Sequence, residues 1–184
     1  MPELHIIGEI MSGHDFVGQS YFCMFEFVVG DQWHAVEGRT SGCTHIMSPG
    51  SAGITWSFPI DVHYVFTSVQ GWPKISIQVW EMDSYGRRDL AGYGVAYIPT
   101  PNSSKEEEVE IATWKPVAWH PNFFVRLYNS IRIALMGGNP VLRDNYLIHT
   151  NDQRTQLHTR SSGIIRLQLN IISRGMKQAS LHCK

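Results

Sequence analysis

Four acidic residues in the sequence have types and spacing that suit a calcium site. They are Asp15, Glu81, Asp83 and Asp89. Calcium prefers about six to eight oxygen ligands, so its sites gather several carboxylates from loops at one end of a sheet. Arg87 and Arg88 lie between the last two acids and can neutralise them without any metal. Two interpretations are open at this point. The acids form a calcium loop, or they cap turns and pair with arginines.

The segment from Val79 to Gly92 resembles the third calcium-binding loop of C2 domains, with Asp15 standing for an acid of the first loop. The resemblance is incomplete. C2 domains place a second first-loop aspartate before a proline and an aromatic residue, where this chain has Ser20-Tyr21, and Glu81 replaces an aspartate. The number of ligands is lower than tight calcium binding needs. We therefore interpret the four acids as vestiges of a calcium loop and expect no metal site.

The spacing of the histidines does not indicate catalysis. The nine histidines include no H-E-x-x-H pair and none has a cysteine at zinc-finger spacing, and the sequence contains neither a G-x-S-x-G elbow nor a P-loop. The closest acid–base pairs are His14 with Asp15 and Asp61 with His63, for which ordinary surface roles are favoured. We therefore expect no catalytic residues, no enzymatic activity and no cofactor.

The elements that would position these residues have mostly the pattern of β-strands. Apolar and polar residues alternate most clearly between Ile54 and Phe66, which is the period of a strand with one buried face. Strands are expected at residues 4–11, 21–29, 54–66, 74–79, 92–98, 107–111 and 165–171. Pro59 lacks an amide hydrogen and predicts an edge position or a bulge. The pattern favours an all-β fold, an antiparallel sandwich of about eight strands.

One segment has the period of an amphipathic helix instead. Between residues 121 and 136, apolar residues recur every three or four positions, with Arg126 and Arg132 among the residues between them. Pro121 suits the first turn, and the sequence Gly-Gly-Asn-Pro at 137–140 provides a stop. We expect this single inserted helix to pack on the sandwich, with a partner-binding role for its outer face as the alternative.

Charge is unevenly distributed along the 184 residues, although the formal net charge is only −1. Residues 1–92 carry 4 basic and 10 acidic side chains, whereas residues 93–184 carry 11 and 6. The near-neutral total provides no overall field that would attract the chain to nucleic acid or to anionic lipid, and nucleic acid is not expected as a partner. Surface arginines suit docking to carboxylates or phosphoinositide headgroups, and the alternative is that they are scattered solubilising charges. A tryptophan in a turn suits an interface anchor, and the alternative is that it fills the core. The candidate partner- or lipid-binding residues are Trp72, Arg126, Arg132, Arg160 and Arg166.

The remaining composition limits the compartment and the contact with membrane. The three cysteines, at positions 23, 43 and 183, lack metal-ligand spacing and favour a reducing compartment. The sequence contains no uninterrupted apolar stretch of about 18 residues, which a spanning helix would need. Contact with membrane, if made, is expected to be peripheral.

Motifs spread over almost the whole chain resemble those of the B9 domain, a C2-related module of ciliary transition-zone proteins. The most distinctive are Asp-Ser-Tyr-Gly-Arg at 83–87 and Leu-Ala-Gly-Tyr-Gly at 90–94. Further matching motifs are Tyr-Phe-Cys at 21–23, Trp-Ser-Phe-Pro-Ile-Asp at 56–61, Gly-Trp-Pro at 71–73, Thr-Trp-Lys-Pro at 113–116, Gly-Gly-Asn-Pro at 137–140 and Leu-His-Thr at 157–159. The resemblance implies a C2-like β-sandwich, with a B9 domain at residues 1–175 and a short C-terminal tail at 176–184.

The resemblance also implies a function without catalysis. Proteins of this family are scaffold subunits that assemble with other B9 domain proteins, of the B9 domain-containing protein 1 and Meckel syndrome type 1 protein types, and with the tectonic-family complex. They act at the cytoplasmic side of the cilium base, in the transition zone, basal body and cytoskeleton, and support ciliogenesis and the ciliary diffusion barrier. Kinship with C2 domains implies an alternative function, peripheral binding of membrane phospholipid that is independent of calcium or only weakly dependent on it.

Overall fold

The computed structural model describes residues 1–101, 106–117, 121–136, 138–143, 146–149 and 157–176. Within them are the strands β1 (Glu3–His14), β2 (Tyr21–Val28), β3 (Trp33–Gly38), β4 (Ser41–Cys43), β5 (Ile54–Phe66), β6 (Lys74–Met82), β7 (Arg88–Tyr97), β8 (Glu107–Pro116) and β9 (Thr159–Arg174). Two helices, α1 (Phe123–Met136) and α2 (Tyr146–His149), lie between β8 and β9. After Met176, the expected C-terminal tail falls outside the described residues.

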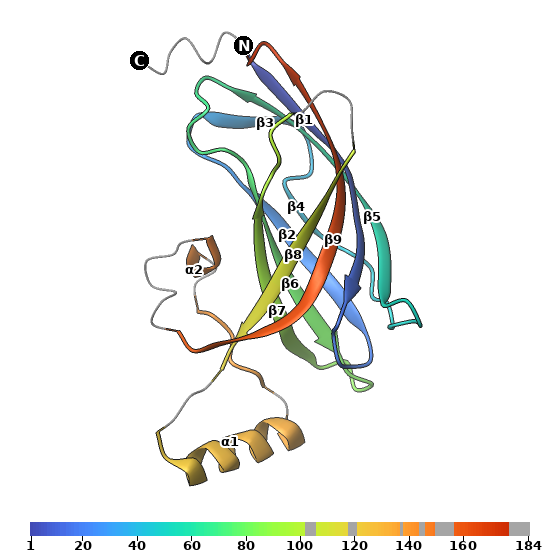
Figure 1. Ribbon diagram of the computed structural model, residues 1–184, viewed down its shortest axis with the longest axis vertical. Helices are drawn as coiled ribbons and strands as arrows, with labels where there is room; N and C mark the ends of the chain where they lie inside the picture. Colours follow the sequence, from blue (N-terminus) through green and yellow to red (C-terminus); the bar gives the residue numbers. More distant parts are fainter. Residues whose placement is uncertain (102–105, 118–120, 137, 144–145, 150–156, 177–184) are drawn as a thin grey trace.

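All of these strands form one antiparallel sheet in the order β3-β5-β1-β9-β8-β7-β6-β2-β4. Its weakest junction lies between β7 and β8, where the register contains a single pair, Tyr93 with Trp114. The sheet curls so that its two ends face each other as layers (Figure 1). A hydrogen bond of 3.2 Å from Trp56 Nε1 on β5 to the Tyr21 carbonyl on β2 joins these layers. The expected all-β, C2-like sandwich is confirmed, with nine strands in the described residues instead of the expected number of about eight.

The hydrophobic core lies between the two layers and follows from the alternation of residues along the strands. Every second residue of β5 from Ile60 to Phe66 is buried, and the same holds for Ile165, Leu167 and Leu169 of β9. Successive side chains of a strand point to opposite faces, so the alternating sequence places one apolar row inside and one polar row outside. Each large apolar side chain buried in this way contributes about 1.5–3 kcal/mol of transfer free energy.

Pro59 lies at a local irregularity of β5, as its missing amide hydrogen predicts. β3 pairs only with Val62–Phe66, so within the described structure Pro59 has β1 alone as its paired neighbour. The β1–β5 register shifts between Ile10 and Ser12, next to Pro59, and Ser57 has a positive φ of 43°. The prediction of an edge position or a bulge is confirmed.

Two strands were not expected from the sequence, and both lie at the ends of the sheet. Only Trp33 is buried among the residues of β3, so this strand shows no alternation of apolar and polar residues. β4 is three residues long, too short for any period to be visible. β9 also begins at Thr159, before the expected start at residue 165. The alternation therefore reports only those parts of a strand that pack against the core.

The Gly-Tyr-Gly sequence of β7 lies at the junction of the two layers, and its geometry explains the residue types. A Cβ atom on Gly94 would lie 2.7 Å from Ile111 Cγ2, and one on Gly92 would lie 2.9 Å from Thr113 Oγ1. Glycine is therefore needed where side chains of β8 approach β7 closely. Tyr93, between the two glycines, points to the opposite surface of β7 and is fully buried there.

A second, smaller apolar cluster covers that outer surface of β7. Leu90, Tyr93, Trp114 and Ile148 are its buried members, and Leu142 packs against them. The Leu142 amide also donates a hydrogen bond of 3.2 Å to the Tyr93 hydroxyl. The segment that follows α1 is therefore docked on the outside of the sandwich.

Helix α1 begins at Phe123 and ends at Met136, close to the expected limits, but it stands apart from the sheet (Figure 1). The expectation that it packs on the sandwich is wrong. Leu142 and Ile148 already cover the second apolar cluster, and among the described residues α1 contributes none of its members. None of the helices in the described residues is long and apolar enough to span a membrane.

Candidate functional site

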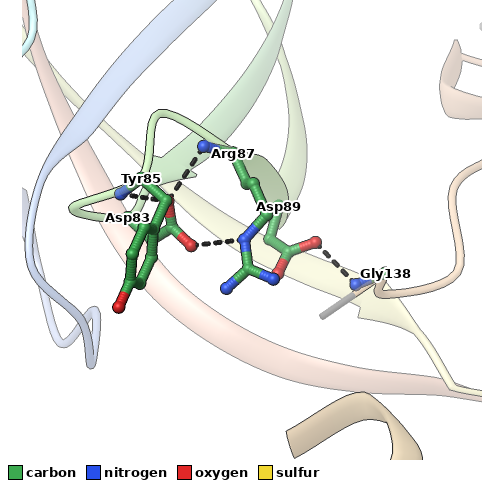
Figure 2. A network of polar contacts seen from close by, with 5 residues as sticks. All are labelled: Asp83, Tyr85, Arg87, Asp89 and Gly138. Atoms are coloured by element: carbon green, nitrogen blue, oxygen red, sulfur yellow. Dashed lines mark hydrogen bonds and ion pairs between the residues drawn. The ribbon is translucent and has the colours of Figure 1, made fainter. Parts of the chain in front are cut away.

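Two of the acids expected to belong to a calcium loop are Asp83, in the β6–β7 loop, and Asp89, at the start of β7, and Figure 2 shows how they are held. Asp83 Oδ1 accepts hydrogen bonds from the backbone amides of Tyr85 at 2.8 Å and Arg87 at 2.9 Å. Its Oδ2 accepts a third from Arg87 Nε at 2.7 Å. Gly86 adopts a φ of 77°, which glycine reaches without strain. Asp83 therefore organises the turn through protein donors alone.

These contacts also determine the charge state of the loop. Desolvation raises the pKa of Asp83, but the hydrogen bonds from Arg87 and Tyr85 lower it by more, so that its pKa lies below the ordinary value of 3.8. The hydrogen bond to Asp83 in turn raises the pKa of Arg87. Both side chains therefore stay ionised at neutral pH, and a cation at Asp83 would have to displace a guanidinium group.

Asp89 has a different task, at the start of β7. Its Oδ1 accepts a hydrogen bond of 2.9 Å from the Gly138 amide, as Figure 2 shows. Next to it, Asn139 Nδ2 donates to the Leu90 carbonyl at 3.3 Å. Asp89 therefore anchors the segment directly after α1 to the end of the sandwich.

Glu81 and Asp15 line a separate cavity of 350 Å³ at the same end of the sheet. The backbone amide of Gln19 donates to Glu81 Oε1 at 3.3 Å. Burial, and secondarily the charge of Glu81, raise the pKa of Tyr21 beside it. A Cβ atom on Gly18 would collide with Glu81 Oε1 and with the Tyr21 hydroxyl, so a larger residue there would require the Glu81 and Tyr21 side chains to shift.

Basic residues of β8 and β9 line the same cavity. Lys115 and Arg160, which are paired in the β8–β9 register, share it with Asp15 and Glu81. Arg160 was expected as a partner- or lipid-binding residue and Lys115 was not. The structure therefore brings acids of the acidic half of the chain next to bases of the basic half.

The carboxylate oxygens at this end of the sandwich do not form a set of ligands that fits a calcium ion. Asp83 and Asp89 accept hydrogen bonds from protein groups, while Glu81 faces a cavity that it shares with Lys115. Calcium needs about six to eight oxygen ligands. Within the part of the chain that the structure describes, no group of three or more His, Cys, Asp or Glu side chains could hold a metal. The interpretation of the acids as vestiges of a calcium loop stays a prediction.

Trp72 lies in the turn before β6 and plugs one end of the main core. Its Nε1 donates a hydrogen bond of 2.6 Å to the Ile98 carbonyl, and its ring meets that of Trp33 edge to face at 5.4 Å. The side chain is only partly exposed and packs against the core. Of the two expected alternatives, the structure places Trp72 as a core plug, and a role in partner binding stays a prediction.

The remaining candidate arginines lie in two different environments. Arg126 and Arg132 are exposed on α1. Arg166 lies on β9, where its Nε is 2.9 Å from Glu110 Oε1 and 3.8 Å from Glu108 Oε1 on the neighbouring strand. Arg166 therefore forms an ion pair with a neighbouring strand of the same chain, whereas the arginines of α1 face solvent.

Arg166 belongs to a polar outer surface, which we call the ion-paired face. It consists of the outward residues of β5, β1, β9 and β8: Glu3, His5, Ile7, Glu9, Asp61, His63, Glu108, Glu110, Arg166, Gln168, Asn170, Ile172 and Arg174. His5 Nε2 and Asp61 Oδ1 are 2.8 Å apart, and His63 Nε2 lies 3.7 Å from Glu3 Oε2. The expectation that Asp61 and His63 have ordinary surface roles fits this arrangement.

The opposite outer surface has a different character, and we call it the apolar face. Its large apolar members are the outward residues of β2, β6 and β7: Phe22, Met24, Val28, Trp80, Tyr93, Val95 and Tyr97. Sequence reasoning missed this surface. The signal was present, because residues 21–29 are apolar at nearly every position and do not alternate with polar ones.

Leu142 and Ile148 cover about half of the apolar face, and the other half is open as far as the described residues show. In the open half, Met24 is 41 % exposed and Tyr97 is 65 % exposed. A hollow of 430 Å³ lies beside Met24, between β4 and β6, with Ser76 buried at its base. Glu26, Ser76 and Gln78 also line this hollow, so the open half offers an indented surface of mixed apolar and polar residues next to an intramolecular docking site.

Comparison with known proteins points to one family. A family model described as "Ciliary basal body-associated, B9 protein" matches residues 4–172. B9 domain-containing protein 2 of Danio rerio is 38% identical over 176 residues, which cover 95% of this chain and 95% of that protein. B9 domain-containing protein 2 of Bos taurus is 33% identical over 185 residues that cover both chains completely. B9 domain-containing protein 1 of Xenopus laevis is 24% identical, over 95% of this chain and 86% of that protein.

These matches confirm the resemblance inferred from the motifs. The motifs at 90–94, 113–116 and 157–159 predict a greater likeness to B9 domain-containing protein 2 than to B9 domain-containing protein 1. The identities of 38% and 33% against 24% agree with that prediction.

Proposed function

Because the chain belongs to the B9 family of ciliary basal body-associated proteins, we propose that it is a non-enzymatic scaffold subunit at the cytoplasmic side of the cilium base. It assembles with other B9 domain proteins, of the B9 domain-containing protein 1 and Meckel syndrome type 1 protein types, and with the tectonic-family complex. This assembly supports ciliogenesis and the diffusion barrier of the transition zone. The task of the chain is to be bound by neighbours.

The observation that carries the proposal is the open half of the apolar face. Leu142 and Ile148 of the chain itself already dock on the adjoining half. Met24 and Tyr97 extend the same surface without a cover in the described residues. Burial of apolar surface drives most protein association, so a partner that continues the cover is favoured.

The shape and polarity of this surface suit another B9 domain. The face of a sheet packs on the face of a second sheet at a distance of about 10 Å, with interdigitating side chains. The hollow beside Met24 can accept a protruding side chain, and Glu26 and Gln78 at its border offer hydrogen-bonding groups. Interfaces typically combine an apolar centre with such a polar rim. We therefore place the B9 partner on the open half of the apolar face.

The test is co-expression with the B9 domain-containing protein 1 of the same organism, followed by size-exclusion chromatography. Met24→Asp puts a charge into the centre of the proposed interface, where burial without a partner is costly. Ile7→Asp is the matched control, because Ile7 is 38 % exposed and Met24 41 %, but Ile7 lies on the ion-paired face. We expect Met24→Asp to abolish co-elution and Ile7→Asp to preserve it.

Thermal unfolding of both variants distinguishes a lost interface from a lost fold. The placement is contradicted if Met24→Asp co-elutes like the unaltered chain or if Ile7→Asp is the variant that dissociates. The scaffold role itself is contradicted if the unaltered chain fails to co-elute with any B9 partner.

A further inference from the structure

Helix α1 has an exposed apolar stripe that the assembly role does not use. The stripe consists of Phe123, Phe124, Leu127, Tyr128 and Ile131, whose exposed fractions range from 47 % for Leu127 to 77 % for Phe124. With 3.6 residues per turn, these positions fall on one side of the helix. Val125, on the other side, is less exposed than all of them. The helix therefore turns its apolar side toward solvent, the reverse of a helix that belongs to a core.

The charges around the stripe are all of one sign. Arg126 and Arg132 are exposed and lie at its two borders, about 110–130° from its centre by helical geometry. The sequence contains no acidic residue from position 111 to position 143. An apolar stripe with a cation on each side matches a surface that is apolar below and anionic above.

Two loops at the same end of the molecule as the helix also expose apolar side chains. α1 lies at the same end of the molecule as the β1–β2 and β6–β7 loops (Figure 1). Val17 in the first loop is 97 % exposed, and Tyr85 in the second is 84 % exposed. Asp89 ties the segment after α1 to this end through the Gly138 amide at 2.9 Å. Apolar side chains on three separate segments suit a broad surface better than a narrow groove for a single helix.

We propose that α1 is an amphipathic helix that binds the surface of an anionic phospholipid bilayer. The apolar stripe enters the boundary between headgroups and acyl chains, and Arg126 and Arg132 remain at the level of the phosphates. Binding combines burial of the stripe with attraction of the arginines to anionic headgroups. Calcium has no part in it, since the stripe and the arginines need no metal to contact lipid.

The proposal is tested by co-sedimentation of the full-length chain with vesicles of phosphatidylcholine and phosphatidylserine, and with vesicles of phosphatidylcholine alone. We expect binding to the anionic vesicles, weaker binding to the neutral ones, and a decrease with added salt. Binding should be the same in calcium and in a calcium chelator. Binding that requires calcium would overturn the assignment to α1, because the acids of the loops would then be responsible.

Two pairs of variants separate the apolar and the charged contributions. Phe124→Glu with Leu127→Glu should weaken vesicle binding by about thirtyfold or more, since two buried side chains are lost. Its control, Val36→Glu with Ile172→Glu, changes two exposed apolar residues elsewhere and should bind like the unaltered chain. Arg126→Gln with Arg132→Gln should weaken binding by about tenfold, whereas Arg39→Gln with Arg174→Gln should not.

Circular dichroism and thermal unfolding of each variant establish that the sandwich is intact. The proposal is overturned if the unaltered chain does not bind anionic vesicles, or if the α1 variants bind them as well as the controls do. One outcome would assign the stripe to protein binding and make the lipid assignment wrong. In it, the unaltered chain does not bind vesicles, and the α1 variants no longer co-elute with the B9 partner.

Discussion

The two outer faces of the sandwich are built from strands of the same sheet, yet they expose different chemistry. On the ion-paired face, charged residues of adjacent strands meet directly, as Arg166 meets Glu110 at 2.9 Å and His5 meets Asp61 at 2.8 Å. On the apolar face, the row Phe22-Trp80-Leu90 is apolar across β2, β6 and β7, the other rows mix apolar and polar residues, and the chain covers part of the face itself. The charged groups of the first face pair with one another, whereas the second face is partly covered by the segment that follows α1.

The exposure of single residues does not reveal this difference. Ile7 and Met24 are exposed by 38 % and 41 %, so by this measure they are alike. Their neighbours differ, because Ile7 is paired with Asp61 and Asn170, whereas Met24 is paired with the uncharged Cys43 and Gln78, and its row then reaches Tyr93. A docking surface is therefore recognised by the residues around an exposed apolar side chain, and not by the exposure of that side chain alone.

The largest effect is expected from removing the contact that fastens the cover on the apolar face. Tyr93→Ala deletes a fully buried ring and the hydroxyl that accepts from the Leu142 amide. We expect the free energy of unfolding to fall by about 3–5 kcal/mol. Tyr97→Ala, on the same strand but 65 % exposed, should change it by less than about 0.5 kcal/mol. Urea denaturation measures both, and equal effects would show that the cover contributes nothing.

A smaller effect is expected at the junction that joins the layers of the two faces. Gly94→Ala would place a Cβ 2.7 Å from Ile111 Cγ2, so the buried Ile111 side chain or the strands themselves must shift. We expect a loss of about 1–3 kcal/mol in the free energy of unfolding, as for other overpacked sites. Gly50→Ala, where the nearest atom would be 3.6 Å away, is the control and should be close to neutral. An unchanged midpoint for Gly94→Ala would mean that the junction is loose.

The ion pairs of the polar face should contribute less than either change. A double-mutant cycle of Arg166→Gln and Glu110→Gln should give a coupling of about 0.2–1 kcal/mol, since both side chains are substantially exposed. Repeating the cycle in about 1 M salt should reduce the coupling toward zero. A coupling of several kcal/mol that persists in salt would contradict the expectation that solvent and salt screen the ion pairs of this face.

The smallest effect concerns the loop at the end where α1 lies. Because the folded pKa of Asp83 is below 3.8, the ionised carboxylate stabilises the folded loop above pH 3.8, and this contribution is lost as the pH falls through the folded pKa. Carboxyl-carbon NMR titration should therefore give a midpoint below 3.8 for Asp83. Arg87→Gln should move the midpoint upward, since it removes the side-chain hydrogen bond. An unchanged Asp83 midpoint in the Arg87→Gln variant would contradict the role assigned to Arg87.

Sequence reasoning succeeded where a residue's type is dictated by contact with the core. The alternation from Ile54 to Phe66 predicted the limits of β5, because this strand buries one complete face. It failed at β3 and β4, which lie at the sheet ends and bury little. The period of α1 revealed its apolar side, but a period contains no information about what, if anything, covers that side.

The candidate site was predicted in part for a similar reason. Local spacing favoured pairing of Arg87 with Asp83, four residues apart, and the structure contains this pair. Arg88 does not pair in the same way, since its guanidinium lies 5.6 Å from the centre of the Phe22 ring. Lys115 and Glu81 line one cavity because the sheet curls and brings β8 and β9 close to the end of β6. No local pattern encodes such an arrangement.

Hydroxyl-radical footprinting of the chain, alone and bound to a B9 domain-containing protein 1, tests the central claim most directly because it reads side-chain exposure residue by residue. We predict that oxidation of Met24 and Tyr97 falls strongly in the complex, while oxidation of Ile7 and Ile172 does not change. Protection of Ile7 and Ile172, with Met24 and Tyr97 still oxidised as in the free chain, would contradict the account.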